Sequence, residues 1–166
     1  MTRPNLVVSF LASHGGSAVR QVVSAIKNGE LNASCGIVIT NNKDSEIYRW
    51  CTENDIQVRH ISGSTHAVES DKDRAIDQAL SAVGTNLVVL SGYMKKIGPI
   101  TLKNYEGKIL NIHPSLLPKH GGIGLYGDRV HESVLRSGDS KTGATVHIIN
   151  EEYDEGPIVA QHFVSV

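Results

Sequence analysis

The sequence predicts an α/β fold, an open, doubly wound and mostly parallel sheet with flanking helices. Short apolar runs rich in Val and Ile alternate along the chain with stretches whose apolar residues recur at helical spacing. The runs are apolar along nearly their whole length, which is typical of strands buried on both faces of a parallel sheet. Because the 166 residues contain no internal repeat, low-complexity tract or linker, we expect residues 1–166 to form a single domain.

The composition is that of an ordinary globular protein, with 40% hydrophobic residues, 20% charged residues and a net charge of −1. Since there is no excess of Lys and Arg, we expect no nucleic-acid partner. The apolar run near the N-terminus is too short for a signal sequence or a membrane span, so we expect a cytoplasmic protein without a membrane partner. The two cysteines, Cys35 and Cys51, show no zinc-binding spacing, and no metal site is expected.

The first strand is expected over residues 5–11, followed by a glycine-containing loop and a helix that ends at Asn28-Gly29. Ser17 is the expected N-cap of this helix. A glycine-rich turn into a helix N-terminus exposes backbone N–H groups, which suits an anion such as phosphate. A plain strand-to-helix turn is the alternative, because the loop has neither G-x-G-x-x-G nor the lysine of a P-loop. The apolar residues that predict the helix are Val19, Val22, Val23 and Ile26.

The same patterns predict the remaining elements. Further strands are expected over 34–40, 57–61, 86–91, 108–113, 143–149 and 158–164, and further helices over 45–54, 71–83 and 128–136. In the helix over 128–136, the side chains of Val130, Val134 and Leu135 are expected to point inward, toward the core.

Two of the connecting loops have ligand-binding character. Tyr93, Met94 and Lys95 follow the strand over 86–91 and combine apolar with basic groups, which suits a flat ring system with an acidic tail. A core methionine beside solvated lysines is the alternative. Residues 120–127 hold four glycines, which allow a backbone to approach a ligand closely.

Asn111, His113 and Asp154 are the candidate reactive residues. Asn111 and His113 lie two residues apart at the carboxyl end of a predicted strand, so their side chains share a face, and Asp154 lies in the turn before the last strand. Ligands bind at the carboxyl ends of strands in open α/β sheets. An amide and an imidazole stabilise a developing oxyanion, which suits acyl transfer to an amine. The alternative is that Asn111 caps a turn and His113 bonds to the backbone.

Three ordered motifs extend this interpretation: residues 111–118 (NIHPSLLP), 143–147 (GATVH) and 153–161 (YDEGPIVAQ). Together they resemble the 10-formyltetrahydrofolate-dependent formyltransferases, in particular those that act on glycinamide ribonucleotide. The likeness extends over almost the whole chain, from the first strand to Gln161.

The resemblance implies a Rossmann-like formyltransferase fold and transfer of a formyl group from the co-substrate 10-formyltetrahydrofolate to the amine of glycinamide ribonucleotide in purine synthesis. It implies small-molecule substrates, no metal, and a monomer or homodimer. It also implies that Asn111 and His113 polarise the formyl oxygen, while Asp154 favours charged His113 and relays a proton through water.

The resemblance assigns binding residues as well. Gly15, Gly16 and Ser17 match the loop that receives the substrate phosphate. The positions that match the folate pocket are Leu90, Tyr93, Met94, Lys95, Ile97, Ile109, Ile149, Asn150 and Asp154.

The chain departs from this pattern at three places. Ala18 replaces the asparagine usual after Gly-Ser, Lys95 stands where arginine is common, and the family's C-terminal segment has no counterpart after Val166. These departures keep other functions open. The alternatives are hydrolysis of formyltetrahydrofolate, formylation of another amine, and binding of a folate or nucleotide by a degenerate protein without turnover.

Overall fold

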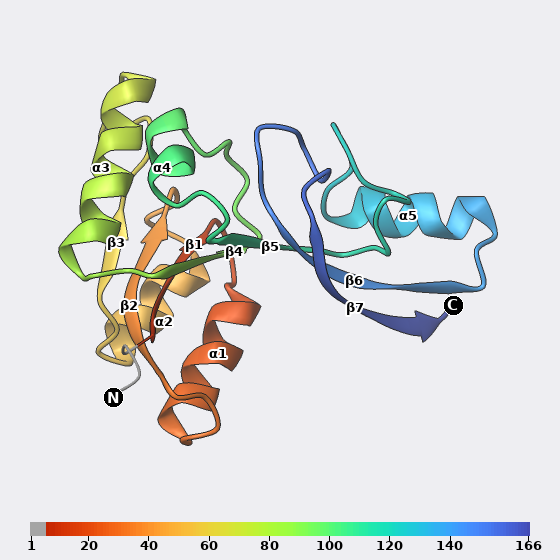
Figure 1. Ribbon diagram of the computed structural model, residues 1–166, viewed down its shortest axis with the longest axis horizontal. Helices are drawn as coiled ribbons and strands as arrows, with labels where there is room; N and C mark the ends of the chain where they lie inside the picture. The colour runs from red at the N-terminus through yellow and green to blue at the C-terminus, as the bar shows by residue number, and fades with distance from the viewer. Residues whose placement is uncertain (1–5) are drawn as a thin grey trace. The chain divides into compact units, whose positions relative to one another are not determined.

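Seven strands form an open mixed sheet with flanking helices, which confirms the predicted α/β fold class (Figure 1). This computed structural model describes residues 6–166. Asn5, the expected first residue of the first strand, lies outside the described residues. The chain divides into two compact units, Met1–Lys108 and Ile109–Val166.

The first unit is a parallel α/β layer in the strand order β3-β2-β1-β4. Helices α1 and α2 lie on one face of this layer, and α3 and α4 on the other (Figure 1). Its strands are β1 (Leu6–Ala12), β2 (Ala33–Thr40), β3 (Val58–His60) and β4 (Leu87–Ser91), and its helices are α1 (Ser17–Lys27), α2 (Glu46–Glu53), α3 (Glu69–Ala82) and α4 (Pro99–Asn104).

The core of the first unit is built from the continuous apolar runs of its strands. Phe10 and Leu11 of β1, with Val38 and Ile39 of β2, are completely buried. In register, Leu11 lies beside both Ile39 and Leu90. Each such side chain contributes about 1.5–3 kcal/mol on burial, so these strands are held by packing on both faces, as their apolar pattern predicts.

The beginning of α1 differs from the prediction. The helix begins at Ser17, and the N-cap is Gly16, which has φ 60° and no side-chain cap. Ser17 is therefore not the N-cap. The left-handed conformation at Gly16, together with the packing of Ile47 against it, selects glycine at this position.

Helix α4 was not predicted from the sequence. This helix is only six residues long and begins at Pro99. Its first turn is capped by a side chain from another helix. Asp73 of α3 accepts hydrogen bonds from the Ile100 and Thr101 N–H groups at 2.8 and 3.1 Å. Asp73 is buried, so this carboxylate satisfies donors that would otherwise be unpaired.

The second unit contains three antiparallel strands and one helix. They are β5 (Ile109–His113), α5 (Asp128–Ser137), β6 (Lys141–Ile148) and β7 (Ile158–Ser165). Strand β6 pairs with β5 on one side and with β7 on the other. Val130 and Val134 of α5 are buried as predicted, but Leu135 is 68% exposed, so its inward assignment was wrong. Leu135 directly follows Val134, and neighbouring positions point about 100° apart around a helix.

Among residues 6–166, none of the helices has the length and apolar character needed to cross a bilayer.

Candidate active site

His113 ends strand β5 and is buried, with 4% of its surface exposed. Its Nδ1 lies 3.0 Å from Ser115 Oγ, and the Ser115 hydroxyl donates to the Lys119 carbonyl at 2.7 Å. A hydroxyl has one hydrogen, and a carbonyl can only accept. Ser115 Oγ therefore accepts from His113, which means that Nδ1 carries a proton. The tautomer of His113 thus follows from its surroundings.

The other nitrogen of His113 faces Asp154. His113 Nε2 lies 3.4 Å from Asp154 Oδ2 and has no hydrogen-bond partner among the described residues. The same carboxylate oxygen accepts the Gly122 N–H at 2.9 Å. Asp154 adopts φ 58°, a left-handed conformation that few residues other than glycine adopt, and its side chain is 13% exposed. The turn before β7 therefore presents a mostly buried carboxylate to an imidazole.

Asn111 lies opposite His147 in the register of β5 and β6. Asn111 Nδ2 lies 3.1 Å from His147 Nε2, and His147 Nε2 lies 3.7 Å from Asp154 Oδ1. Burial lowers the pKa of His147, while Asp154 opposes that shift. The imidazole is thereby favoured in its neutral form, in which Nε2 can accept from the Asn111 amide. His147 orients Asn111 and leaves the second amide hydrogen free to donate.

His147 was not among the predicted site residues, although it lies within one of the three motifs. The sequence offers one sign of its importance: side chains two positions apart on a strand share a face, and His147 and Thr145 are both buried on one face of β6. Only the pairing of β6 with β5 shows that this face carries Asn111 and His113.

Thr145 fixes the loop that follows His113. Its hydroxyl donates to the Ser115 carbonyl at 2.7 Å and accepts the Leu117 N–H at 3.0 Å. Gln161 of β7 donates to the Thr145 hydroxyl and to the Leu117 carbonyl. These bonds hold the turn after β5 from two strands, and so restrict the position of the His113 ring.

The four side chains Asn111, His113, His147 and Asp154 form one connected polar group. An amide N–H and a protonated imidazole nitrogen can stabilise negative charge on a carbonyl oxygen during attack by a nucleophile. A carboxylate beside an imidazole can stabilise the charged ring and can accept a proton through water. The geometry therefore suits acyl transfer without a nucleophile supplied by the protein.

The predicted phosphate loop belongs to the first unit. Gly15 precedes Gly16, the N-cap of α1, and Ser17 is the first helical residue. Among residues 6–166 no side-chain cap is found at this helix end, so N–H groups of the first turn can meet an anion. Arg20 of the same helix donates through Nε to the Gly15 carbonyl at 3.0 Å.

Five of the predicted folate-binding residues lie at or after the end of β4, also in the first unit. Leu90 and Ile97 are buried in the core, whereas Met94 is 43% exposed and Lys95 is exposed. The Met94 N–H donates to Ser13 Oγ at 2.8 Å, which joins this loop to the end of β1. Burial raises the pKa of Tyr93 to about 12, and Glu69 adds to the effect.

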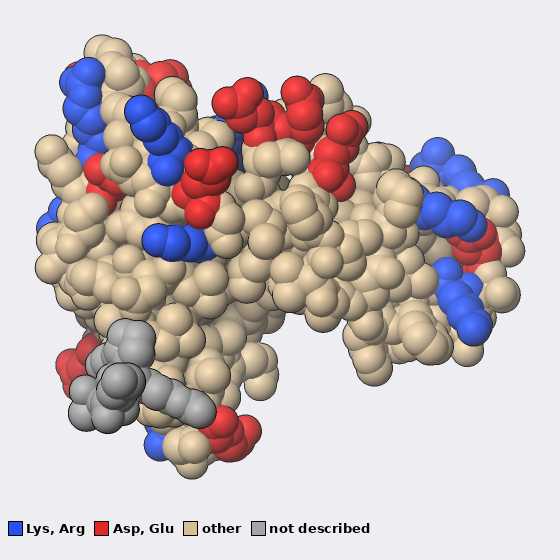
Figure 2. All heavy atoms as spheres, in the orientation of Figure 1, with Lys and Arg blue, Asp and Glu red and all other residues tan. Residues whose placement is uncertain are grey.

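The other predicted folate-binding residues lie in the second unit. Ile109 is buried at the start of β5, and its carbonyl accepts the Ile149 N–H at 3.0 Å. Asn150 is exposed and accepts the Glu152 N–H, which shapes the turn that ends in Asp154. Figure 2 shows acidic side chains gathered over this turn.

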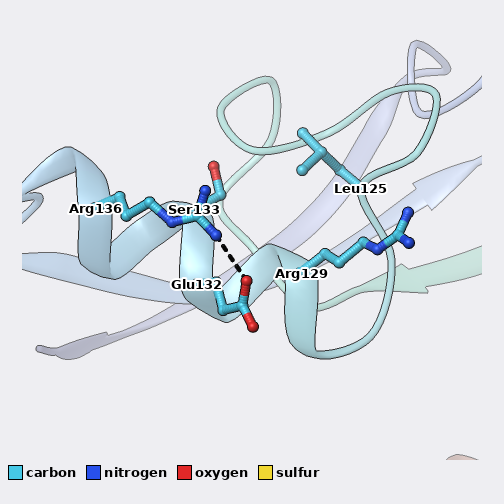
Figure 3. A pocket seen from close by; sticks show the side chains of 5 residues that line it. All are labelled: Leu125, Arg129, Glu132, Ser133 and Arg136. Carbon is cyan, nitrogen blue, oxygen red and sulfur yellow. Dashed lines mark hydrogen bonds and ion pairs between the residues drawn. The ribbon is translucent and has the colours of Figure 1, made fainter.

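Two hollows lie elsewhere in the second unit. One, of about 350 Å³, lies along α5, where Arg136 pairs with Glu132 at 2.7 Å (Figure 3). The other, of about 290 Å³, includes Lys119, His120 and Asp139 in its lining. Neither contains a residue predicted to react or to bind substrate. Within residues 6–166 no group of His, Cys, Asp and Glu has the arrangement of a metal site.

Comparison with known proteins supplies the chemical context. Residues 6–166 match the protein family described as formyl transferase. The chain is 37% identical to the chloroplastic phosphoribosylglycinamide formyltransferase of Arabidopsis thaliana, over 96% of this chain and 55% of that protein. It is 33% identical to the phosphoribosylglycinamide formyltransferase of Haemophilus influenzae, over 96% of this chain and 73% of the relative.

A solved structure shows the same arrangement of the chain. Glycinamide ribonucleotide transformylase 1 from Symbiobacterium toebii superposes with a TM-score of 0.90 at 28% identity, covering 98% of this chain and 74% of the other. The chain spans about half the length of the two plant relatives, 55% and 51%.

Proposed function

Because the chain belongs to the formyl transferase family, we propose that it transfers a formyl group from 10-formyltetrahydrofolate to the amine of glycinamide ribonucleotide, a step of purine synthesis. Relatives that bear the name phosphoribosylglycinamide formyltransferase support this substrate pair. The connected group of Asn111, His113, His147 and Asp154 supports the reaction type.

One observation carries the proposal. His113 has its Nδ1 proton held by Ser115, while its Nε2 is buried, makes no hydrogen bond among the described residues and lies beside Asp154. A buried polar atom without a partner is costly in a folded protein and is typical of a functional site. A carbonyl oxygen of a substrate supplies the missing partner when His113 is protonated.

In this mechanism the substrate amine attacks the formyl carbon, a new C–N bond forms, and the bond from the formyl carbon to N10 of the folate breaks. His113 donates from Nε2 to the formyl oxygen as negative charge develops on it. Asn111, oriented by His147, donates its free amide hydrogen to the same oxygen. Asp154 stabilises charged His113 and accepts the amine proton through water, for return to N10.

The binding residues follow the same proposal. The substrate phosphate binds to the backbone of Gly15, Gly16 and Ser17 at the beginning of α1. Ala18 offers no side-chain donor there, so backbone N–H groups supply most of the contacts. The folate-binding residues in this proposal are those that the family resemblance matches, with Tyr93, Met94 and Lys95 among them. Residues 1–166 act as a formyltransferase catalytic domain on small-molecule substrates.

The test is to follow loss of the formyl group from 10-formyltetrahydrofolate with and without glycinamide ribonucleotide. Transfer predicts turnover only when the amine is present. Turnover without the amine would instead indicate hydrolysis. Turnover only with a different amine would identify that amine as the substrate in place of glycinamide ribonucleotide. Tight folate binding without turnover in any of these mixtures would overturn the enzymatic proposal.

A further inference from the structure

His120 lies outside the polar group that contains His113 and Asp154, yet the residues on either side of it are linked to that group, to His113 through Ser115 and to Asp154 directly. On one side, the Lys119 carbonyl accepts the Ser115 hydroxyl that holds His113 Nδ1. On the other side, the Gly122 N–H donates to Asp154 Oδ2. The conformation at His120 therefore decides how these two backbone groups are spaced.

That conformation is unusual for a residue with a side chain. His120 has φ 56°, in the left-handed region that disfavours residues other than glycine. Such a conformation persists where surrounding contacts hold it. A glycine would adopt it without strain, so a specific use of the imidazole is indicated at this position.

The ring of His120 is bonded through both nitrogens and is 12% exposed. Nε2 donates to Asp139 Oδ2 at 3.0 Å, and Nδ1 lies 2.8 Å from Ser133 Oγ on α5. Hydrogen bonds from His120 and Lys119 lower the pKa of Asp139 to about 2, so this carboxylate is ionised at neutral pH. Ser133 lies in the middle of α5 and is labelled in Figure 3. The ring thus ties the loop to a helix and to the segment before β6.

Gly121, which follows His120, lies close to both Leu117 and Asp154. A Cβ added at Gly121 would lie 2.4 Å from Leu117 Cδ2 and 3.4 Å from Asp154 Cβ. The backbone at residue 121 is therefore packed directly against both the turn after β5 and the Asp154 side chain. A shift of the His120 backbone would be passed on to Asp154.

A nucleophilic role for Ser133 explains the geometry less well. Its hydroxyl, His120 and Asp139 form a hydrogen-bonded series, but Ser133 lies within a helix whose backbone N–H groups are engaged in the helix itself. Donors for an oxyanion are missing at such a position. The arrangement fits an anchor.

We propose that His120 is a positioning residue for the His113–Asp154 pair: its imidazole, held by Ser133 and Asp139, fixes the left-handed turn that aligns the Lys119 carbonyl and the Gly122 N–H. The expected effect on formyl-transfer activity rests on the proposed function. The positioning of the His113 ring by His120 does not, because the tautomer of His113 can be measured in the free protein.

The test compares His120→Gly, Ser133→Ala and the control His131→Ala with the unaltered protein. Glycine tolerates the left-handed conformation, so His120→Gly removes the ring without adding backbone strain. His131→Ala removes an exposed histidine of α5. The ¹⁵N shifts of His113 are recorded near pH 8, where an ordinary histidine, with a pKa of about 6.5, is neutral.

In the unaltered protein and in His131→Ala, we expect the Nδ1 shift of a protonated nitrogen. In His120→Gly it moves toward the average of two exchanging tautomers, and in Ser133→Ala it moves in the same direction by less. If formyl transfer is observed, kcat falls about 10- to 100-fold in His120→Gly, while KM for the folate stays within about twofold.

Unchanged His113 shifts in folded His120→Gly would overturn the proposal, whatever the activity. If His120→Gly does not fold, Ser133→Ala decides in the same way. Absence of formyl transfer in the unaltered protein would count against the proposed function alone, because the ring measurement still tests the positioning role.

Discussion

His113 Nε2 and Asp154 Oδ2 lie 3.4 Å apart, although the two residues are 41 positions apart in the sequence. His113 ends β5, and Asp154 lies in the turn before β7. Strand β6 pairs antiparallel with both β5 and β7, and the turn between β6 and β7 brings the Asp154 carboxylate to the His113 ring. The contacts around this pair and the loop at Gly16 lead to five expected outcomes.

Replacement of His113 by alanine removes Nε2, which lies 3.4 Å from Asp154 Oδ2 and has no hydrogen-bond partner among the described residues. A proton donor at a reacting oxygen is worth about 10²- to 10⁴-fold, so kcat should fall by at least that range while the far-ultraviolet circular dichroism is retained. A folded His113→Ala variant with full activity would refute the role of this residue.

Asp154→Asn keeps an oxygen that can accept from Gly122 but removes the negative charge beside His113. We expect kcat to fall about 100-fold or more, since the imidazolium loses its partner, with little change in KM for the folate. The kinetic parameters are compared with those of Glu152→Gln, which changes an exposed carboxylate of the same turn. Equal activity of the two variants would exclude a role for the charge of Asp154.

Ser115→Ala removes the acceptor of His113 Nδ1 and the donor to the Lys119 carbonyl. Loss of a buried hydrogen bond costs about 1 kcal/mol of unfolding free energy, and release of the tautomer should lower kcat about 10-fold. Urea denaturation and steady-state kinetics measure the two effects. Ser140→Ala, at an exposed position, is the control; if both substitutions behave alike, Ser115 does not hold the tautomer.

The buried imidazole of His147 predicts a pH dependence of stability. Burial lowers its pKa in the folded state from 6.5, so the unfolded chain binds the proton more strongly. The stabilising contribution is complete above about pH 6.5 and is lost as the pH falls toward the folded-state pKa. Urea denaturation at pH 7.5 and 5.5 should show a smaller loss of stability in His147→Gln than in the unaltered protein. His162→Gln, at an exposed position, should leave the loss unchanged.

Gly16→Ala tests the beginning of α1. An added Cβ at φ 60° would lie 2.6 Å from two atoms of buried Ile47. The left-handed conformation costs an alanine about 1–2 kcal/mol, and the overlap adds about 1–3 kcal/mol. Gly29→Ala, at φ 74° with no atom within 4 Å, carries the first cost alone. The free energy of unfolding, measured in urea, should therefore be clearly lower for Gly16→Ala than for Gly29→Ala. Equal free energies would show that the Ile47 side chain moves aside without an energetic cost.

The strands and longer helices follow from local patterns, and most of their boundaries fall within two residues of the prediction. Continuous apolar runs predicted β1 and β2, and helical spacing predicted α1 and α3. Helix α4 escaped prediction because its cap, Asp73, comes from a residue 27 positions away from the Ile100 that it binds. Leu135 was misplaced because an apolar residue type does not reveal on which side of a helix it lies.

By itself the sequence determined the α/β class, the order of the strands and, through three motifs, the identity of Asn111, His113 and Asp154 as candidates. These properties follow from local periodicity and residue type. Only the tertiary structure decided that His147 orients Asn111, that Ser115 sets the tautomer of His113 and that the loop at His120 contacts Asp154. The physical reason is that strand register and loop packing bring distant polar groups together, and no local pattern encodes which partners meet.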